Sequence, residues 1–181
     1  LPAVVVLHPW VHTEVKRLAL SDFGTRLLEG DSSNPVTEAL LRRELPRFHP
    51  GHGPAGGEFT DDVADMAAWA PHLDHSYVAV QGPPGTGKTY RAARIVHALI
   101  SAGQRVGITA FSHRAIENVV AAVSEVFTDQ GDIDKLRGVR VKKSATQTYA
   151  GFANVDGPKG AIGQDFNLFA GSTWLFTNDG I

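Results

Sequence analysis

Apolar side chains in the middle of the chain recur at spacings that predict two amphipathic helices, because residues three and four apart share one face of a helix. The first set is Ala92, Ile95, Val96, Leu99 and Ile100, and the second is Ile116, Val119, Val120, Val123 and Phe127. Gly103 follows the first set where a left-handed C-terminal cap is expected, and Ser112 precedes the second set as an N-cap. The sequence thus marks an end of each helix.

Short apolar runs predict strands around these helices. The expected strands cover residues 76–80, 105–109, 139–142 and 166–169, and residues 151–163 are interpreted as a loop. Strands that alternate with helices favour a parallel sheet over an antiparallel one. The pattern therefore predicts an α/β fold with a parallel sheet flanked by helices.

The first 58 residues are interpreted as a mostly helical extension. The expected elements are a β-like run at residues 4–7, a helix at about 13–20, a second helix opened by Ser21, and a third from Asn34 and Pro35 to Arg43. Glycine and proline dominate residues 49–57, which predicts a loop and a boundary there. We therefore expect two domains, residues 1–58 and 59–181. After the boundary, Thr60 is predicted to cap a helix with Asp61 and Asp62 in its first turn.

Eight residues after the run at 76–80 fill every fixed position of the phosphate-loop pattern GxxxxGK[ST]. They are Gly82, Pro83, Pro84, Gly85, Thr86, Gly87, Lys88 and Thr89. A triphosphate is held by backbone N–H groups in a concavity, and glycines leave that concavity open. Lys88 is predicted to reach the β- and γ-phosphates and the Thr89 hydroxyl to ligate Mg²⁺, which makes these two the catalytic candidates. With Tyr90 added, the predicted nucleotide-binding set runs from 82 to 90, the cofactors are ATP and Mg²⁺, and the fold is that of a P-loop NTPase.

Composition narrows the class of protein further. The chain has 181 residues, a formal net charge of −2 and no cysteine, so disulfides and thiolate metal sites are excluded. No apolar run approaches the roughly 18 residues that span a bilayer, so no membrane partner is expected. Histidines occur in pairs at His8 and His12, His49 and His52, and His72 and His75, but none of these pairs has a zinc-site pattern. We expect a cytoplasmic protein and, because residue 1 is leucine, a piece of a longer one.

Two further stretches carry a resemblance to a known family. Gln81 leads into the phosphate loop, and Ser112, Ala115, Ile116, Glu117 and Asn118 fit the pattern that follows the second strand in superfamily 1 helicases of the Upf1-like group. His113 stands where those helicases usually have asparagine. The stretch from Gly171 to Phe176, GSTWLF, resembles bacterial helicase-like ATPases that are often fused behind a RecB-type nuclease.

This resemblance implies a truncated, RecA-like first motor domain. In the family, the segment matching Ser112, His113 and Arg114, called motif Ia, touches the backbone of single-stranded DNA or RNA, which makes nucleic acid an expected partner. The Asp-Glu pair that organises Mg²⁺ and water in relatives has no counterpart here, and Asp179 is a poor substitute. The resemblance therefore implies ATP binding with little hydrolysis by this piece alone. The rest of the motor, and possibly a nuclease domain, would complete the full-length protein.

Two alternatives for the function remain open: a P-loop regulatory module without translocating activity, and an AAA+ ATPase.

A cluster of basic residues near the third expected strand has two interpretations. Its members are Arg137, Arg140, Lys142 and Lys143. They could follow a nucleic-acid backbone, or they could be a solvated strand edge protected against aggregation.

Overall fold

The computed structural model describes residues 13–31 and 34–178, and the chain divides into two compact units, residues 1–33 and 34–181. The β-like run expected at residues 4–7 lies outside the described residues, as does Asp179. Residues 34–58 group with the second unit. The domain division at residue 58 stays a prediction.

The described part of the first unit is one helix, α1 (Glu14–Leu28), which has no buried residue. Ser21 does not open a second helix here, contrary to the prediction. Its carbonyl accepts a hydrogen bond from the Thr25 hydroxyl at 3.0 Å inside the continuous helix. No proline interrupts residues 14–28, so the helix continues through the serine.

The second unit begins with two short helices, α2 (Pro35–Arg42) and α3 (Val63–Trp69). The predicted cap of α2 is confirmed, because the Asn34 side chain accepts a hydrogen bond from the Thr37 amide at 3.2 Å. The predicted cap of α3 is wrong. Asp62 caps it by accepting the Asp65 amide at 2.9 Å, while the Thr60 hydroxyl binds the Asp65 carboxylate. Thr60 comes two residues too early to reach that amide.

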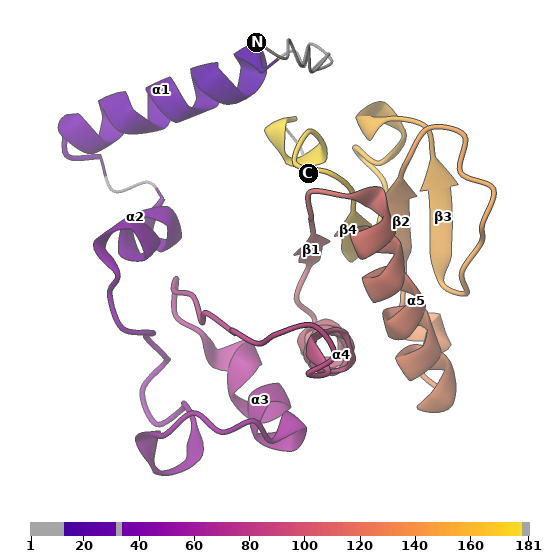
Figure 1. Ribbon diagram of the computed structural model, residues 1–181, viewed down its shortest axis with the longest axis horizontal. Coiled ribbons are helices and arrows are strands. Elements are labelled where there is room, and N and C mark those ends of the chain that lie inside the picture. The colour runs from indigo at the N-terminus through magenta and orange to yellow at the C-terminus, as the bar shows by residue number, and fades with distance from the viewer. Residues whose placement is uncertain (1–12, 32–33, 179–181) are drawn as a thin grey trace, which may run out of the picture. The chain divides into compact units, whose positions relative to one another are not determined.

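Two longer helices and four strands form the centre of the second unit (Figure 1). The helices are α4 (Lys88–Ser101) and α5 (His113–Asp129), and the strands are β1 (Val106–Ile108), β2 (Gly138–Val141), β3 (Phe152–Val155) and β4 (Leu168–Ala170). The strand order is β1-β4-β2-β3, and every pair is parallel. The prediction of an α/β fold with a parallel sheet flanked by helices is confirmed.

Side chains of the sheet alternate between two cores, as the period of a strand requires. On one face, Leu168 and Ala170 pack with the apolar stripes of α4 and α5, and Phe127 is fully buried there. On the other face, Val139 and Phe169 pack with Ala161 and Leu175. The helices α4 and α5 therefore cover one face of the sheet.

Two strand predictions fail for reasons of pairing. Residues 76–80 form no strand, because Val78 packs into a third cluster beside Met66 and Trp69 and the segment gains no ladder partner. Conversely, β3 lies inside the stretch predicted as loop. Its formation depends on Gly138 of β2, where a Cβ atom would sit 2.5 Å from the Phe152 ring. That contact joins residues distant in sequence, so local pattern does not reveal it.

Candidate nucleotide and nucleic-acid sites

The phosphate-loop segment forms a backbone cradle at the start of α4. Gly85 and Gly87 have φ angles of 84° and 76°, in the left-handed region that favours glycine. Gly82 is restricted by space instead, because a Cβ atom there would lie 2.5 Å from the Thr86 hydroxyl oxygen. These glycines let the loop curve tightly.

Lys88 folds back over this cradle. Its ammonium donates to the carbonyl oxygens of Gly82 and Pro83, the latter at 2.7 Å, and the Thr86 hydroxyl donates to the Pro83 carbonyl at 2.9 Å. Lys88 is exposed, so its charge remains accessible at the loop. The arrangement holds a compact cation where the sequence predicts phosphates.

The N-terminus of α4 has no side-chain cap, because its N-cap residue is Gly87. The first backbone N–H groups of a helix have no partner within the helix, so an uncapped start offers them to an anion. The Thr89 hydroxyl has no hydrogen bond to any described residue and is exposed. Tyr90 differs, because the Arg94 guanidinium carbon lies 3.4 Å from the centre of its ring.

Arg91 is a loop-supporting residue that sequence reasoning missed. It donates to the Thr86 carbonyl oxygen and, at 3.2 Å, to the Asp61 carbonyl oxygen. Its guanidinium also forms a 3.4 Å ion pair with the exposed Asp61 carboxylate. Only its position one helical turn after Gly87 hinted at this contact.

A cavity of about 830 Å³ adjoins the loop and reaches Gly82, Lys88 and Arg91. Its wall includes the aromatic residues Phe59, Trp69 and Tyr77. Trp69 is 4% exposed, and its indole N–H has no hydrogen-bond partner among the described residues. The cavity therefore combines an apolar wall with the cationic end of the loop.

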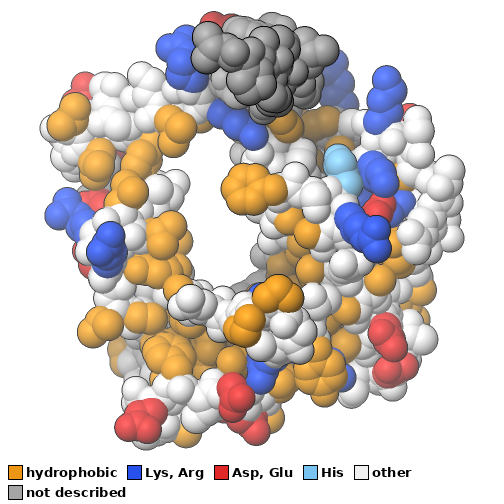
Figure 2. All heavy atoms as spheres, in the orientation of Figure 1, with side chains coloured by type: hydrophobic (Ala, Val, Ile, Leu, Met, Phe, Trp, Pro, Cys, Tyr) orange, Lys and Arg blue, Asp and Glu red, His pale blue; other side chains and the backbone are white. Residues whose placement is uncertain are grey.

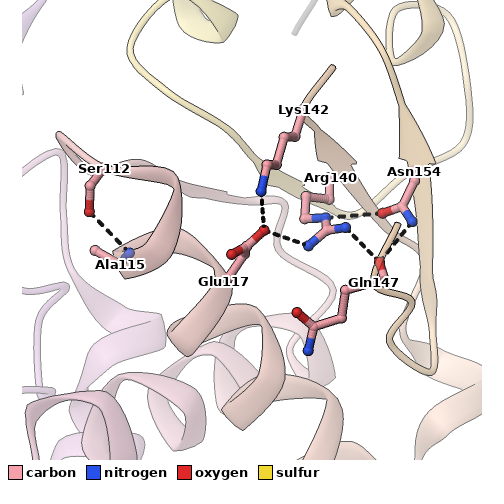
Figure 3. Close-up of polar contacts among 7 residues, drawn as sticks. All are labelled: Ser112, Ala115, Glu117, Arg140, Lys142, Gln147 and Asn154. Atoms are coloured by element: carbon pink, nitrogen blue, oxygen red, sulfur yellow. Dashed lines mark hydrogen bonds and ion pairs between the residues drawn. The ribbon is translucent and has the colours of Figure 1, made fainter. Parts of the chain in front are cut away.

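The second predicted site lies at the N-terminus of α5. Ser112 caps this helix as predicted, accepting the Ala115 amide at 3.2 Å (Figure 3). His113 and Arg114 are exposed beside it, and Phe111 is fully exposed. Because α5 follows β1 through a short connection, its N-terminus lies at the edge of the sheet where β1 ends.

A buried arginine ties α5 to the sheet (Figure 3). Arg140 on β2 is 1% exposed, and it donates to the Glu117 carboxylate at 3.0 Å and to the Asn154 side-chain oxygen at 3.0 Å. Its third hydrogen bond goes to the Gln147 carbonyl at 2.5 Å. The same Glu117 oxygen accepts from Lys142 at 2.7 Å. The guanidinium of Arg140 on β2 therefore connects α5, β3 and the loop that follows β2.

Electrostatics keep this carboxylate ionised. The hydrogen bond from Lys142 is the main cause that lowers the pKa of Glu117, and Arg140 and His113 lower it further. The buried positive charge of Arg140 thus has a negative partner on α5. Such a pair fixes the relative placement of two elements, because separating it leaves a charge buried alone.

The structure does not bring the predicted basic cluster together as one surface. Arg140 is buried, which neither sequence interpretation foresaw, and Lys142 is paired with Glu117. Arg137 precedes β2 and forms a 3.2 Å ion pair with Asp165. Lys143 is exposed, and its side chain has no hydrogen bond or ion pair with any described residue.

Comparison with known proteins places the chain in a family. A family model described as "AAA domain" matches residues 62–156, more than half of the chain. The chain is also 43% identical over 44 residues to "DNA replication ATP-dependent helicase/nuclease DNA2" from Saccharomyces cerevisiae, a match covering 24% of this chain and 3% of that protein. No solved structure matches. Within the described part of the chain, no helix is both long and apolar enough to cross a membrane.

These matches confirm the resemblance noted in the sequence to the first motor domain of superfamily 1 helicases. The parallel sheet and the glycine loop before α4 agree with that assignment. The chain is thus helicase-like in its nucleotide-binding half. It belongs to the AAA domain family.

Proposed function

We propose that this chain is the ATP-binding part of a superfamily 1 helicase-like motor, which couples ATP binding and hydrolysis to its hold on single-stranded DNA or RNA in the full-length protein. The observation that carries the proposal is the uncapped start of α4, with Lys88 held over the glycine cradle. In this proposal residues 59–181 act as the first motor domain and residues 1–58 as its extension.

The residues present fit Mg-ATP. The cradle from Gly82 to Gly87 would hold the phosphates by its backbone amides, and Lys88 would neutralise their charge. The Thr89 hydroxyl, which lacks a partner among the described residues, would ligate the metal. Bound Mg²⁺ would supply positive charge to the β- and γ-phosphate oxygens. Tyr90 lies one residue further along α4 and would contact the nucleotide only if its ring leaves Arg94.

The cavity beside the loop supports a place for the nucleoside. Its volume of about 830 Å³ is in the range of small-molecule sites, and the walls of such sites are mostly apolar with few polar groups. Phe59 and Tyr77 supply apolar surface, and the unpaired indole N–H of Trp69 is a donor that a small rearrangement could expose.

Nucleic acid would bind at the N-terminus of α5. Backbone amides, the Ser112 hydroxyl, the His113 imidazole and the Arg114 guanidinium are groups that contact phosphates. In Figure 2, Lys and Arg side chains lie beside a histidine over the region where α5 begins in Figure 1, with acidic side-chain atoms among them. The positive charge there supports an anionic partner, although the whole chain carries a formal net charge of −2.

Lys88→Ala tests the nucleotide site. We expect Mg-ATP affinity to fall at least about tenfold, because a charge-assisted contact to phosphate is lost. Isothermal titration calorimetry on the 181-residue chain measures it, with Lys159→Ala, an exposed lysine after β3, as the charge-matched control. Equal affinity of Lys88→Ala and wild type would remove the assigned loop.

A second measurement separates the motor from a regulatory P-loop module. Wild-type chain should bind a labelled single-stranded oligonucleotide, and Arg114→Ala should weaken that binding while leaving Mg-ATP affinity unchanged. Fluorescence anisotropy with labelled oligo-dT and oligo-U measures the binding of DNA and of RNA. Absence of binding to either oligonucleotide would favour the regulatory module.

A further inference from the structure

The loop that follows β2, residues 143–148, has an unusual combination of exposed polar side chains and a fixed backbone. Its sequence is Lys-Ser-Ala-Thr-Gln-Thr, and all its side chains except that of Ala145 are exposed. Within the described part of the chain, none of these side chains takes part in a hydrogen bond or an ion pair. The side-chain donors of the loop are therefore available to a partner.

Three contacts hold the backbone of this loop. The Gln147 carbonyl accepts from Arg140 at 2.5 Å and from the Asn154 side-chain amide at 3.0 Å. The Ser144 amide donates to the Asp156 carboxylate at 2.9 Å, at a left-handed φ of 54°. A loop whose backbone is already fixed loses little backbone freedom on binding.

The residue before this loop is linked to α5 near the start of that helix. This residue, Lys142, binds Glu117, which is just over one helical turn from the cap residue Ser112 (Figure 3). The charge of Glu117 is offset by both Arg140 and Lys142, and Asp156 is engaged by the Ser144 amide. An approaching anion therefore meets an ammonium, hydroxyls and an amide, with the nearby carboxylates already bound.

We propose that residues 143–148 bind the sugar–phosphate backbone of a single-stranded nucleic acid, extending the surface at the N-terminus of α5, and that Arg140 holds the loop in position for this contact. The proposal rests on the proposed function, because the same strand would run across both surfaces. Ammonium and hydroxyl groups are common partners of phosphate oxygens and carry no sequence preference. The contact would thus add affinity without base specificity.

The test is a triple variant, Lys143→Ala with Thr146→Ala and Thr148→Ala, in the 181-residue chain. We expect its affinity for a labelled 30-nucleotide oligo-dT or oligo-U to fall about five- to tenfold. The slope of log affinity against log salt should decrease by about 0.7, the value for one phosphate contact on a single strand. Fluorescence anisotropy at several salt concentrations gives both quantities.

Arg105→Ala is the control, because it removes an exposed cation immediately before β1, a strand that β4 separates from β2 and the loop. It should leave oligonucleotide affinity unchanged, and all variants should keep the melting temperature and Mg-ATP affinity of the wild type. If Arg114→Ala weakens binding while the triple variant binds as tightly as the wild type, the loop proposal is overturned and the proposed function stands. If the wild type binds no oligonucleotide, both are overturned.

Discussion

The N-termini of α4 and α5 differ in the partners that they offer to the first backbone amides of the helix. The start of α4 has glycine at its N-cap and leaves its first amides without a side-chain partner, and Lys88 is held by carbonyls of the same loop. The start of α5 is capped by Ser112 and supported from the sheet by Arg140 through Glu117. The N-terminus of α4 therefore has no side-chain cap, whereas the N-terminus of α5 is capped and supported by side chains.

This difference matters for what each terminus can bind. Uncapped amides can converge on a single compact anion such as a polyphosphate. A capped and fixed helix start instead presents side chains at defined places, which suits an extended chain of phosphates. The contrast predicts that α5 depends on distant residues for its placement, while the loop before α4 depends on its own glycines.

The largest expected effect comes from breaking the support of α5. Glu117→Ala leaves the buried Arg140 without a counter-charge, so we expect the free energy of unfolding to fall by about 3 kcal/mol. Urea denaturation measures it, and Glu125→Ala, an exposed glutamate on the same helix, is the matched control. The double variant Glu117→Leu, Arg140→Met should recover part of the loss. If Glu117→Ala and the control unfold at the same urea concentration, the ion pair between Glu117 and Arg140 does not stabilise α5.

A smaller effect is expected at the loop before α4. Gly82→Ala places a Cβ atom against the Thr86 hydroxyl, which must rotate and give up its 2.9 Å bond to the Pro83 carbonyl. We expect Mg-ATP affinity to weaken about tenfold, or about 1.4 kcal/mol, with oligonucleotide affinity unchanged. Calorimetry and anisotropy on one preparation give both numbers. If Mg-ATP affinity and oligonucleotide affinity fall equally, the N-termini of α4 and α5 do not act independently.

The smallest expected effect separates capping from contact at α5. Ser112→Ala should lower the free energy of unfolding by about 1 kcal/mol, because the Ala115 amide loses its cap. Ser112→Asp should keep the stability, since aspartate also caps, but its charge should weaken oligonucleotide binding more than alanine does. Thermal unfolding and anisotropy compare the two variants. The contact hypothesis fails if aspartate preserves oligonucleotide affinity.

The sequence could predict elements whose information is local. The apolar spacing in α4 and α5 and the caps at Asn34 and Ser112 involve residues within a few positions of each other, and the structure confirms them. The phosphate-loop pattern is also local, because its glycines, lysine and threonine lie within eight consecutive residues. Its assignment to ATP stays a prediction that Lys88→Ala tests.

Elements that depend on distant partners could not be predicted in this way. The run at 76–80 has the composition of a strand but lacks a neighbour, and β3 lacks that composition but pairs with β2 across Gly138. Arg140 was assigned to a basic surface because its sequence neighbours are basic. Its burial follows from Glu117, which precedes it by 23 residues, and from Asn154 on the next strand.

The strand order β1-β4-β2-β3 has a consequence for how the chain folds. Val106 pairs with Leu168, so the ladder between β1 and β4 must wait until more than sixty further residues have left the ribosome. Until then α4 can pack on α3 and on α5, but the face of the sheet that both long helices cover is incomplete. Pairings of such long separation slow folding, so helix docking should precede sheet closure during synthesis.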